Sequence, residues 1–276
     1  MDDHTVTGRV VALLDAVAAL GDSATLAELT RGTGIPKPTV RRIAEDLVRR
    51  GLLDRGEDGY RLGTRLVELG VRAAEQQDLH HAITPHAQDL FARSGEIVCG
   101  GAFTDSAVTV IDTVFGFNRA VDMRRGSWPT RFDHPGFLAT AVGRLVLADR
   151  PDLFARLTSR PLTPFTRDTT TSSAHLRSAL DVVRDTGVAV EHNQVMSGFS
   201  CVAVGVRGTD RSLVGFVSVI CRNGTFAPHR LVRPLLDAAA DIDRLLAVKR
   251  RAPAVDSNPW GHRRSRANSC ASVVEG

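Results

Sequence analysis

Lysine, aromatic side chains and long apolar runs are all scarce in this chain of 276 residues. Because no run of about 18 apolar residues occurs, no transmembrane helix is expected. The N-terminal stretch MDDHTVTG opens with acidic residues and lacks the basic and then apolar order of a signal peptide, so we expect a cytoplasmic protein. Only two of the 35 Lys and Arg residues are lysines, so arginine carries nearly all the positive charge.

Cysteine is also scarce, and its spacing argues against a metal site. No two of the four cysteines form a C-x-x-C pair, and three of them lie in apolar, strand-like runs, so we expect reduced core thiols at Cys99, Cys201 and Cys221. His80, His81 and His86 lack the i, i+4 spacing of a helical metal pair. Neither a metal ion nor another cofactor is expected.

The net charge of +4 comes from two regions. Residues 249–276 carry six basic and two acidic residues, so the rest of the chain sums to zero. Within that rest, residues 31–65 hold nine basic and five acidic residues. This local excess is the part of the charge that favours nucleic-acid binding.

The excess of positive charge over residues 31–65 belongs to a segment whose sequence predicts three helices and a hairpin. Residues 6–20 place apolar side chains at helical spacing, and Thr25 with Glu28 makes a capping box for a second helix. In GIPKPTVRRIAEDLVRRG, residues 34–51, the prolines suit a first helical turn and the last glycine suits a position beyond a helix end. Two short strands then flank an Asp58-Gly59 turn, which predicts a winged helix-turn-helix.

The third helix has one apolar and one polar face. Val40, Ile43, Ala44 and Leu47 face the other helices, and the opposite face predicts DNA contacts at Lys37, Thr39, Arg41, Arg42 and Arg49. Arg41 and Arg42 could read base edges or only hold phosphates. Arg41 could instead pair with Glu45 four residues on, and Arg49 could be merely solvated.

The rest of the chain interleaves strands and helices without a strict βα repeat, which favours an α+β fold with an antiparallel sheet flanked by helices. A helix is expected over 64–77, and another over 79–94 that is capped by Asp78 and crossed by Pro85. Strands are predicted over 97–103, 107–113, 119–125, 188–193, 200–207 and 212–221, and helices over 137–149, 173–187 and 229–251. The expected division is a winged domain (1–63), a linker helix (64–78), a second domain (79–250) and a disordered basic tail (251–276).

Several stretches together resemble the IclR family of bacterial transcription regulators. LAELTRGTGIPKPTVRRIAEDLVRRGLLDR and GYRLGTRLVELG are similar to its DNA-binding half. ATAVGRLVLAD, PLTPFTRDTTTSSAHLRSAL, GFSCVAVGVR and LVGFVSV are similar to its GAF-like half. The resemblance implies a dimer or a dimer of dimers on an inverted-repeat operator, with a small effector, often an organic acid, in the second half.

The resemblance also implies the effector-binding positions Ala141, Val142, Glu191, Phe199, Cys201 and Ser218. Free N–H groups at a helix start favour an anionic oxygen. The chain departs from the family pattern at Pro38, Leu138 and Ile220, and Gln194 or Asn193 replaces a common glutamate. These departures favour a larger or less polar effector, such as an aromatic or medium-chain carboxylic acid.

The sequence leaves two other classes of protein open. An enzyme would use Cys201 or Ser218 as nucleophile and would need a base within reach, but His192 lies next to Glu191 and should face the opposite side of a strand. The chain also lacks a G-x-S-x-G elbow. A winged-helix adaptor that binds proteins would show no salt-dependent binding to DNA.

Overall fold

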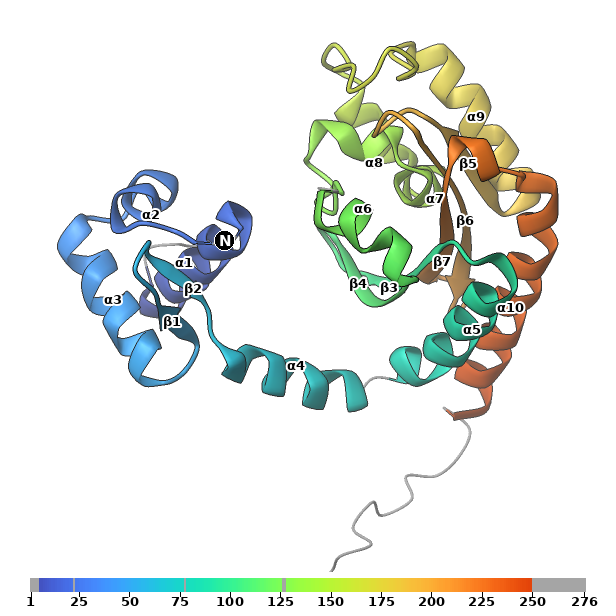
Figure 1. The fold of residues 1–276 in the computed structure, drawn as a ribbon. Helices are drawn as coiled ribbons and strands as arrows, with labels where there is room; N and C mark the ends of the chain where they lie inside the picture. Colours follow the sequence, from blue (N-terminus) through green and yellow to red (C-terminus); the bar gives the residue numbers. More distant parts are fainter. Residues whose placement is uncertain (1–4, 22, 77, 126–127, 250–276) are drawn as a thin grey trace, which may run out of the picture.

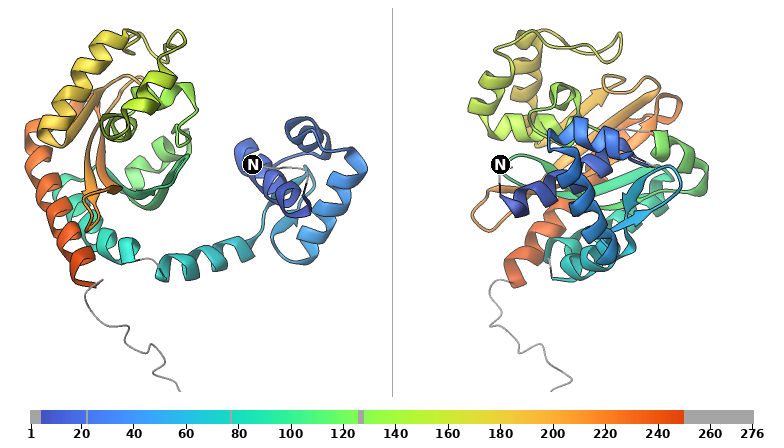
Figure 2. Two further views of the ribbon diagram at one scale, coloured as in Figure 1. Left: turned by 180° about the vertical axis from the view of Figure 1, so that it is seen from behind. Right: turned by 90° about the vertical axis from the view of Figure 1, so that its left-hand side faces the viewer.

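The computed structural model describes residues 5–21, 23–76, 78–125 and 128–249. They form a small N-terminal lobe and a larger C-terminal lobe, joined by the helix α4 (Thr64–Glu75) (Figure 1). Seen from behind, the two lobes stand apart at either end of α4 (Figure 2). Within the described residues, no helix combines the length and the apolar character needed to cross a bilayer.

The N-terminal lobe packs three helices around one apolar core. These are α1 (Val6–Leu20), α2 (Leu26–Thr33) and α3 (Lys37–Arg49), and their core includes Leu13, Val17, Leu29, Val40, Ile43 and Leu47. The capping box is present: the Thr25 hydroxyl accepts a hydrogen bond from Glu28 N (3.2 Å), and Glu28 Oε2 accepts one from Thr25 N (2.9 Å). Gly51, with φ 72°, stands just beyond the end of α3. Local capping signals therefore set these helix boundaries.

The hairpin of this lobe is a short wing. Its strands β1 (Leu53–Arg55) and β2 (Tyr60–Leu62) pair antiparallel. Tyr60 and Ala24 exchange two backbone hydrogen bonds of 2.9 Å, which tie the wing to the loop between α1 and α2. Gly59 has φ 141°, and a side chain there would overlap the Ala24 carbonyl. The winged helix-turn-helix is confirmed.

The C-terminal lobe is built on a five-stranded antiparallel sheet in the order β4-β3-β7-β6-β5. Its strands are β3 (Ile97–Phe103), β4 (Val108–Val114), β5 (Val188–His192), β6 (Phe199–Arg207) and β7 (Leu213–Arg222). Helices α5 (Asp78–Ser94) and α10 (Pro228–Lys249) cover one face, while α7 (Ala141–Asp149), α8 (Pro151–Leu157) and α9 (Ser173–Thr186) lie on the other (Figure 1). The predicted α+β class is confirmed.

Alternation along the strands divides the core in two. Val202 and Val219 face α5 and α10, whereas their neighbours Cys201 and Ile220 face α7 and α9. Cys99, Cys201 and Cys221 are buried free thiols, as expected. Cys270 and the expected tail over 251–276 lie outside the described residues.

The strand predicted over 119–125 is wrong. The chain there forms a 3-10 turn, η1 (Phe117–Arg119), followed by the helix α6 (Ala120–Arg125). Val121 is 54% exposed, so the segment has no apolar face to bury in a sheet. Helical spacing instead turns Arg119 and Asp122 to the same side, where both enter a cluster of ion pairs.

The helix predicted over 137–149 is interrupted. A 3-10 turn, η2 (Pro135–Ala139), comes first, and α7 begins only at Ala141. Thr140 between them is extended, and its hydroxyl accepts a hydrogen bond from Gly143 N at 2.7 Å. This side-chain cap starts a separate helix at Ala141, and the N-terminus of α7 faces the sheet.

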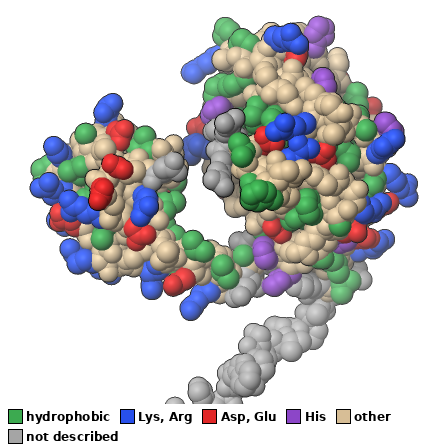
Figure 3. Space-filling view, in the orientation of Figure 1, with side chains coloured by type: hydrophobic (Ala, Val, Ile, Leu, Met, Phe, Trp, Pro, Cys, Tyr) green, Lys and Arg blue, Asp and Glu red, His purple; other side chains and the backbone are tan. Residues whose placement is uncertain are grey.

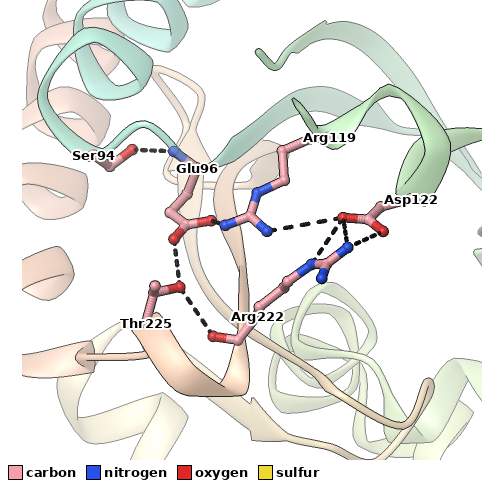
Figure 4. Close-up of polar contacts among 6 residues, drawn as sticks. All are labelled: Ser94, Glu96, Arg119, Asp122, Arg222 and Thr225. Carbon is pink, nitrogen blue, oxygen red and sulfur yellow. Dashed lines mark hydrogen bonds and ion pairs between the residues drawn. The ribbon is translucent and has the colours of Figure 1, made fainter. Parts of the chain in front are cut away.

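A buried ion cluster joins α6 to the ends of the sheet (Figure 4). Arg119 donates to Glu96 at 2.6 Å and lies 3.8 Å from Asp122. Arg222, at the end of β7, makes a bidentate pair with Asp122, and Thr225 of the turn η3 (Asn223–Thr225) donates to Glu96 at 2.5 Å. Both carboxylates of the cluster thus have cationic partners.

Candidate functional site

The polar face of α3 does not pack against the rest of the lobe. Lys37, Arg41, Arg42 and Arg49 are exposed there, and Thr39 is half-buried. Figure 3 shows Lys and Arg side chains gathered on the outer side of the small lobe, over α3, with acidic side chains among them. The five expected DNA-binding side chains thus share one accessible helix.

The arginines of α3 differ in their partners. Arg49 donates to Asp46 at 3.0 Å, and Arg50 donates to the same carboxylate at 2.8 Å. Arg41 and Arg42 make no ion pair within the described parts of the chain, and the Arg41–Glu45 pair considered from the sequence is not formed. The two central arginines are therefore available to another molecule, whereas Arg49 is engaged.

The C-terminal lobe holds a cavity of about 320 Å³ between the start of α7 and the sheet. Five of the six expected effector positions line it, namely Ala141, Val142, Glu191, Cys201 and Ser218. They come from α7 and from three different strands, so only the tertiary fold brings them together. Most of the remaining wall is apolar, as small-ligand cavities require.

The start of α7 contributes backbone donors to this wall. The hydroxyl of Thr140 is occupied by Gly143 N, and among the described residues nothing accepts from the N–H groups of Ala141 and Val142. A side chain at Gly143 would overlap the Phe137 carbonyl, so the glycine keeps α7 close to η2. Two free N–H groups at a helix N-terminus favour an acceptor or an anion.

Glu191 is the acid of the cavity. Its side chain is 3% exposed, and its Oε2 accepts a hydrogen bond from Gln194 N at 2.9 Å. Burial raises the pKa of Glu191 to about 7, although the Gln194 hydrogen bond and the charge of Arg144 oppose the rise. Glu191 therefore changes charge near neutral pH.

Arg144, a residue of α7, lies close to Glu191, a residue of β5. It is 5% exposed and donates to Val190 O at 2.5 Å and to Gln194 Oε1 at 2.7 Å. Its Nε is buried without a partner among the described residues. Burial lowers the pKa of Arg144, and the charge of Glu191 opposes this shift.

Two residues expected near the ligand lie elsewhere. Phe199, at the start of β6, is half-buried under the guanidinium of Arg222, 5.8 Å from its ring centre, and is not part of the cavity wall. Leu138 is buried beside a separate hollow next to α8. Ile220, by contrast, lines the cavity.

Sequence reasoning missed several wall residues, including Trp128, Thr113 and Phe216. The indole N–H of Trp128 is buried without an acceptor in the described part of the chain. Strand alternation could have placed Phe216 beside Ser218, because the two residues are two positions apart on β7. Only the antiparallel pairing of β3 with β4 and β7 could have brought Thr113 near Ser218. The side chain of Trp128 has no such signal in the sequence, because it follows α6 in an irregular segment.

The cavity lacks the arrangement of a nucleophilic enzyme. Burial raises the pKa of the Cys201 thiol well above its ordinary value, which disfavours a thiolate. Ser218 donates to the Cys99 carbonyl at 3.4 Å, and His192 faces the other side of β5, where it contacts Ser200 at 2.8 Å. Over the described ranges, no histidine contacts either candidate nucleophile, and no three His, Cys, Asp or Glu side chains gather as a metal site.

Comparison with known proteins agrees with this architecture. A family model described as the IclR helix-turn-helix domain matches residues 6–57. A second, described as bacterial transcriptional regulator IclR C-terminal, matches residues 71–244, which is more than half of the chain. Together they define a transcription regulator with a DNA-binding domain and an effector-binding domain.

The chain belongs to the IclR family. The glycerol operon regulatory protein of Streptomyces griseus is 26% identical over 250 residues, which cover 88% of this chain and 96% of that protein. A transcriptional regulator of Mycobacterium tuberculosis is 29% identical over 216 residues, covering 76% and 79%. An IclR homologue of Microbacterium hydrocarbonoxydans, solved with 4-hydroxybenzoate, shares the fold with a TM-score of 0.73 at 24% identity, covering 88% of this chain and all of that one.

Proposed function

We propose that this regulator binds an inverted-repeat operator through α3 and changes its operator affinity when a small organic acid fills the cavity of the C-terminal lobe. The observation that carries the proposal is the convergence of Ala141, Val142, Glu191, Cys201 and Ser218 on one cavity. The proposed units are residues 1–63 for DNA, 64–78 as linker and 79–250 for the effector. They act in the cytoplasm.

On DNA, Lys37, Thr39, Arg41 and Arg42 take the contacts in the major groove, because they lie in the N-terminal half of α3, which enters the groove first. Arg49 has a smaller part, since Asp46 already binds it. Exposed arginines beside the groove also hold phosphates, so affinity falls steeply with salt. An adaptor that binds only proteins would show no such dependence.

Two copies are needed for an inverted repeat, and α4 offers a surface for them. Val67, Leu69 and Val71 on this helix are 67%, 47% and 54% exposed. A helix with so many exposed apolar side chains is stabilised by packing against a second helix, and a second copy supplies one with matching two-fold symmetry. Pairs of such dimers would form the dimer of dimers.

In the cavity, the carboxylate of the effector faces the N–H groups of Ala141 and Val142. A hydroxyl or amide at its other end donates to Glu191, because a second carboxylate there would be repelled. A volume of about 320 Å³ suits an aromatic or medium-chain body. The structural relative solved with 4-hydroxybenzoate makes that compound the first probe.

An effector that fits one arrangement of the two copies better than another shifts the population toward that arrangement. The spacing of the two winged domains then changes, and operator affinity changes with it. A catalytic role is not proposed, because burial disfavours the thiolate of Cys201 and no histidine of the described residues contacts Cys201 or Ser218.

The test is fluorescence anisotropy on a labelled fragment of the protein's own promoter region, titrated with salt and with 4-hydroxybenzoate and related acids. The double variant Glu191→Ala, Ser218→Ala should bind DNA as the parent does but lose its response to the effector. A double variant that still responds normally would remove this cavity from consideration.

A further inference from the structure

Arg144 is a buried cation without a carboxylate partner. Its guanidinium donates to a backbone carbonyl and to the amide oxygen of Gln194, and both acceptors are uncharged. Its Nε has no acceptor in the described part of the chain, and no described Asp or Glu forms an ion pair with it. Burying a charge in this way is unfavourable unless another charge compensates for it.

Among the described residues, the one carboxyl group whose charge acts on this cation belongs to the cavity wall. Glu191 interacts with Arg144 through its charge but stays beyond ion-pair distance, and its own hydrogen bond comes from Gln194. Among the cavity-lining residues that the structure describes, none is a lysine, arginine or histidine. A negative charge in the cavity would therefore find Arg144 as its nearest buried countercharge, acting through the low-dielectric wall.

Gln194 sits between the two charged groups. Its backbone N–H donates to Glu191, and its side-chain oxygen accepts from Arg144 and from Thr170 N at 3.2 Å. The side chain positions the guanidinium but brings no negative charge. A glutamate at this position would have nearly the same shape and would neutralise Arg144 from within the protein.

We infer that Arg144, which hydrogen-bonds the neutral side chain of Gln194 and forms no ion pair with a described carboxylate, selects for a negatively charged ligand in the cavity. Arg144 is a positioning and charge-selecting residue, since it does not itself line the cavity. The inference rests on the proposed function, because it assigns the charge preference of the same cavity. It adds a specific source for that preference, separate from the helix start at Ala141.

The test compares acids with their uncharged amides by isothermal titration calorimetry. The probes are 4-hydroxybenzoate with 4-hydroxybenzamide, and phenylacetate with phenylacetamide. The parent protein should prefer each acid over its amide by about tenfold or more. Gln194→Glu should reduce this ratio by about tenfold through loss of acid affinity, with amide affinity unchanged, because only a charged ligand senses the new carboxylate.

Two controls separate charge from structure. Gln194→Met removes the hydrogen bond to Arg144 but leaves its charge uncompensated, so the acid preference should persist. Gln88→Glu adds the same charge at an exposed position of α5, away from the cavity, and should change nothing. Thermal melts of each variant report whether the fold is intact, and a loss of acid preference in Gln194→Met would overturn the inference even if Gln194→Glu does not fold.

An acid preference that survives in Gln194→Glu, or a loss of preference in Gln194→Met, would overturn the inference. So would a parent protein that binds the amides better than the acids. If the amides then also change operator affinity, the proposed regulation stands and only the role of Arg144 is lost. If neither acids nor amides bind, the proposed ligand class fails together with the inference.

Discussion

Arg144 is a buried arginine of the C-terminal lobe and Arg119 a largely buried one, with 11% of its side chain exposed, yet their surroundings differ. Arg119 lies against the carboxylates of Glu96 and Asp122, and Asp122 is held in turn by Arg222 (Figure 4). Arg144 has only a carbonyl and an amide oxygen as partners. Both arginines have an Nε without a partner among the described residues. The charge of Arg119 is paired with carboxylates, whereas that of Arg144 has no ion pair in the described chain and lies next to a cavity.

This contrast separates a structural role from a binding role. A closed set of ion pairs lets α6 dock on the sheet although its side chain Val121 remains exposed. An arginine without an ion pair, such as Arg144, can instead be stabilised by a bound ligand of opposite charge, which adds to the binding free energy of that ligand. The same contrast recurs on α3, where Asp46 engages Arg49 and Arg50 but Arg41 and Arg42 stay without carboxylate partners.

The largest effect is expected from breaking the closed cluster. Arg119→Met leaves Glu96 without its cationic partner and should lower the free energy of unfolding of the C-terminal lobe by about 3–5 kcal/mol. Urea unfolding followed by circular dichroism measures it. The matched control is Arg93→Met, which removes an exposed pair with Asp89 and should cost about 0–1 kcal/mol. Equal losses in the two variants would show that the cluster contributes nothing special.

The next largest effect on the free energy of unfolding is expected from the titration of Glu191. Glu191 has its folded pKa raised to about 7, so the protonated form is favoured by folding. Its contribution to stability is therefore present at low pH and is lost as pH rises toward and through 7. Relative to Glu191→Gln, the parent should lose on the order of 1–3 kcal/mol of unfolding free energy between pH 5 and pH 8.

The control for that titration is Asp133, an acid whose pKa is lowered and not raised by folding. Arg131 lowers the pKa of Asp133, so Asp133→Asn should differ from the parent by a constant amount over the same pH range. A parent curve that runs parallel to that of Glu191→Gln would contradict the perturbed titration of Glu191.

On α3, unpaired arginines should matter more than the paired one. Arg41→Ala or Arg42→Ala should weaken operator binding by about 1–3 kcal/mol if the side chain reads a guanine, and should relax the preference at that base pair. Arg49→Ala should cost less, because Asp46 holds its guanidinium. Anisotropy on matched and mutated operators measures all three. If removing both Arg41 and Arg42 leaves operator affinity intact, α3 is not the recognition helix.

The smallest effect is expected from removing the basic tail. The sequence from residue 252 onward is rich in Pro, Ser, Asn and Arg and contains no Leu, Ile, Met or Phe. Cutting after Arg251 should leave the melting temperature of the protein unchanged, because little apolar surface is lost. A fall of several degrees in a thermal scan would mean instead that Trp260 and its neighbours pack on the body of the protein.

Sequence alone determined the winged domain because its signals are local. The capping box at Thr25, the prolines before α3 and the Gly51 stop each act within a few residues, so their meaning does not depend on distant contacts. The apolar period of α3 likewise indicated its buried face. The order of the later elements was strong enough to predict an antiparallel α+β domain.

Tertiary structure decided what depends on long-range pairing. Residues 119–125 form a helix because Arg119 and Asp122 meet Glu96 and Arg222 from distant segments, which no local pattern encodes. Sheet pairing decided the cavity wall: Glu191 lies opposite Cys201 within it, whereas Phe199 ends up under Arg222. The preference proposed for Arg144 depends on folding, which buries its charge beside Gln194 without an ion pair to a described carboxylate, since burial is what makes an unpaired charge costly.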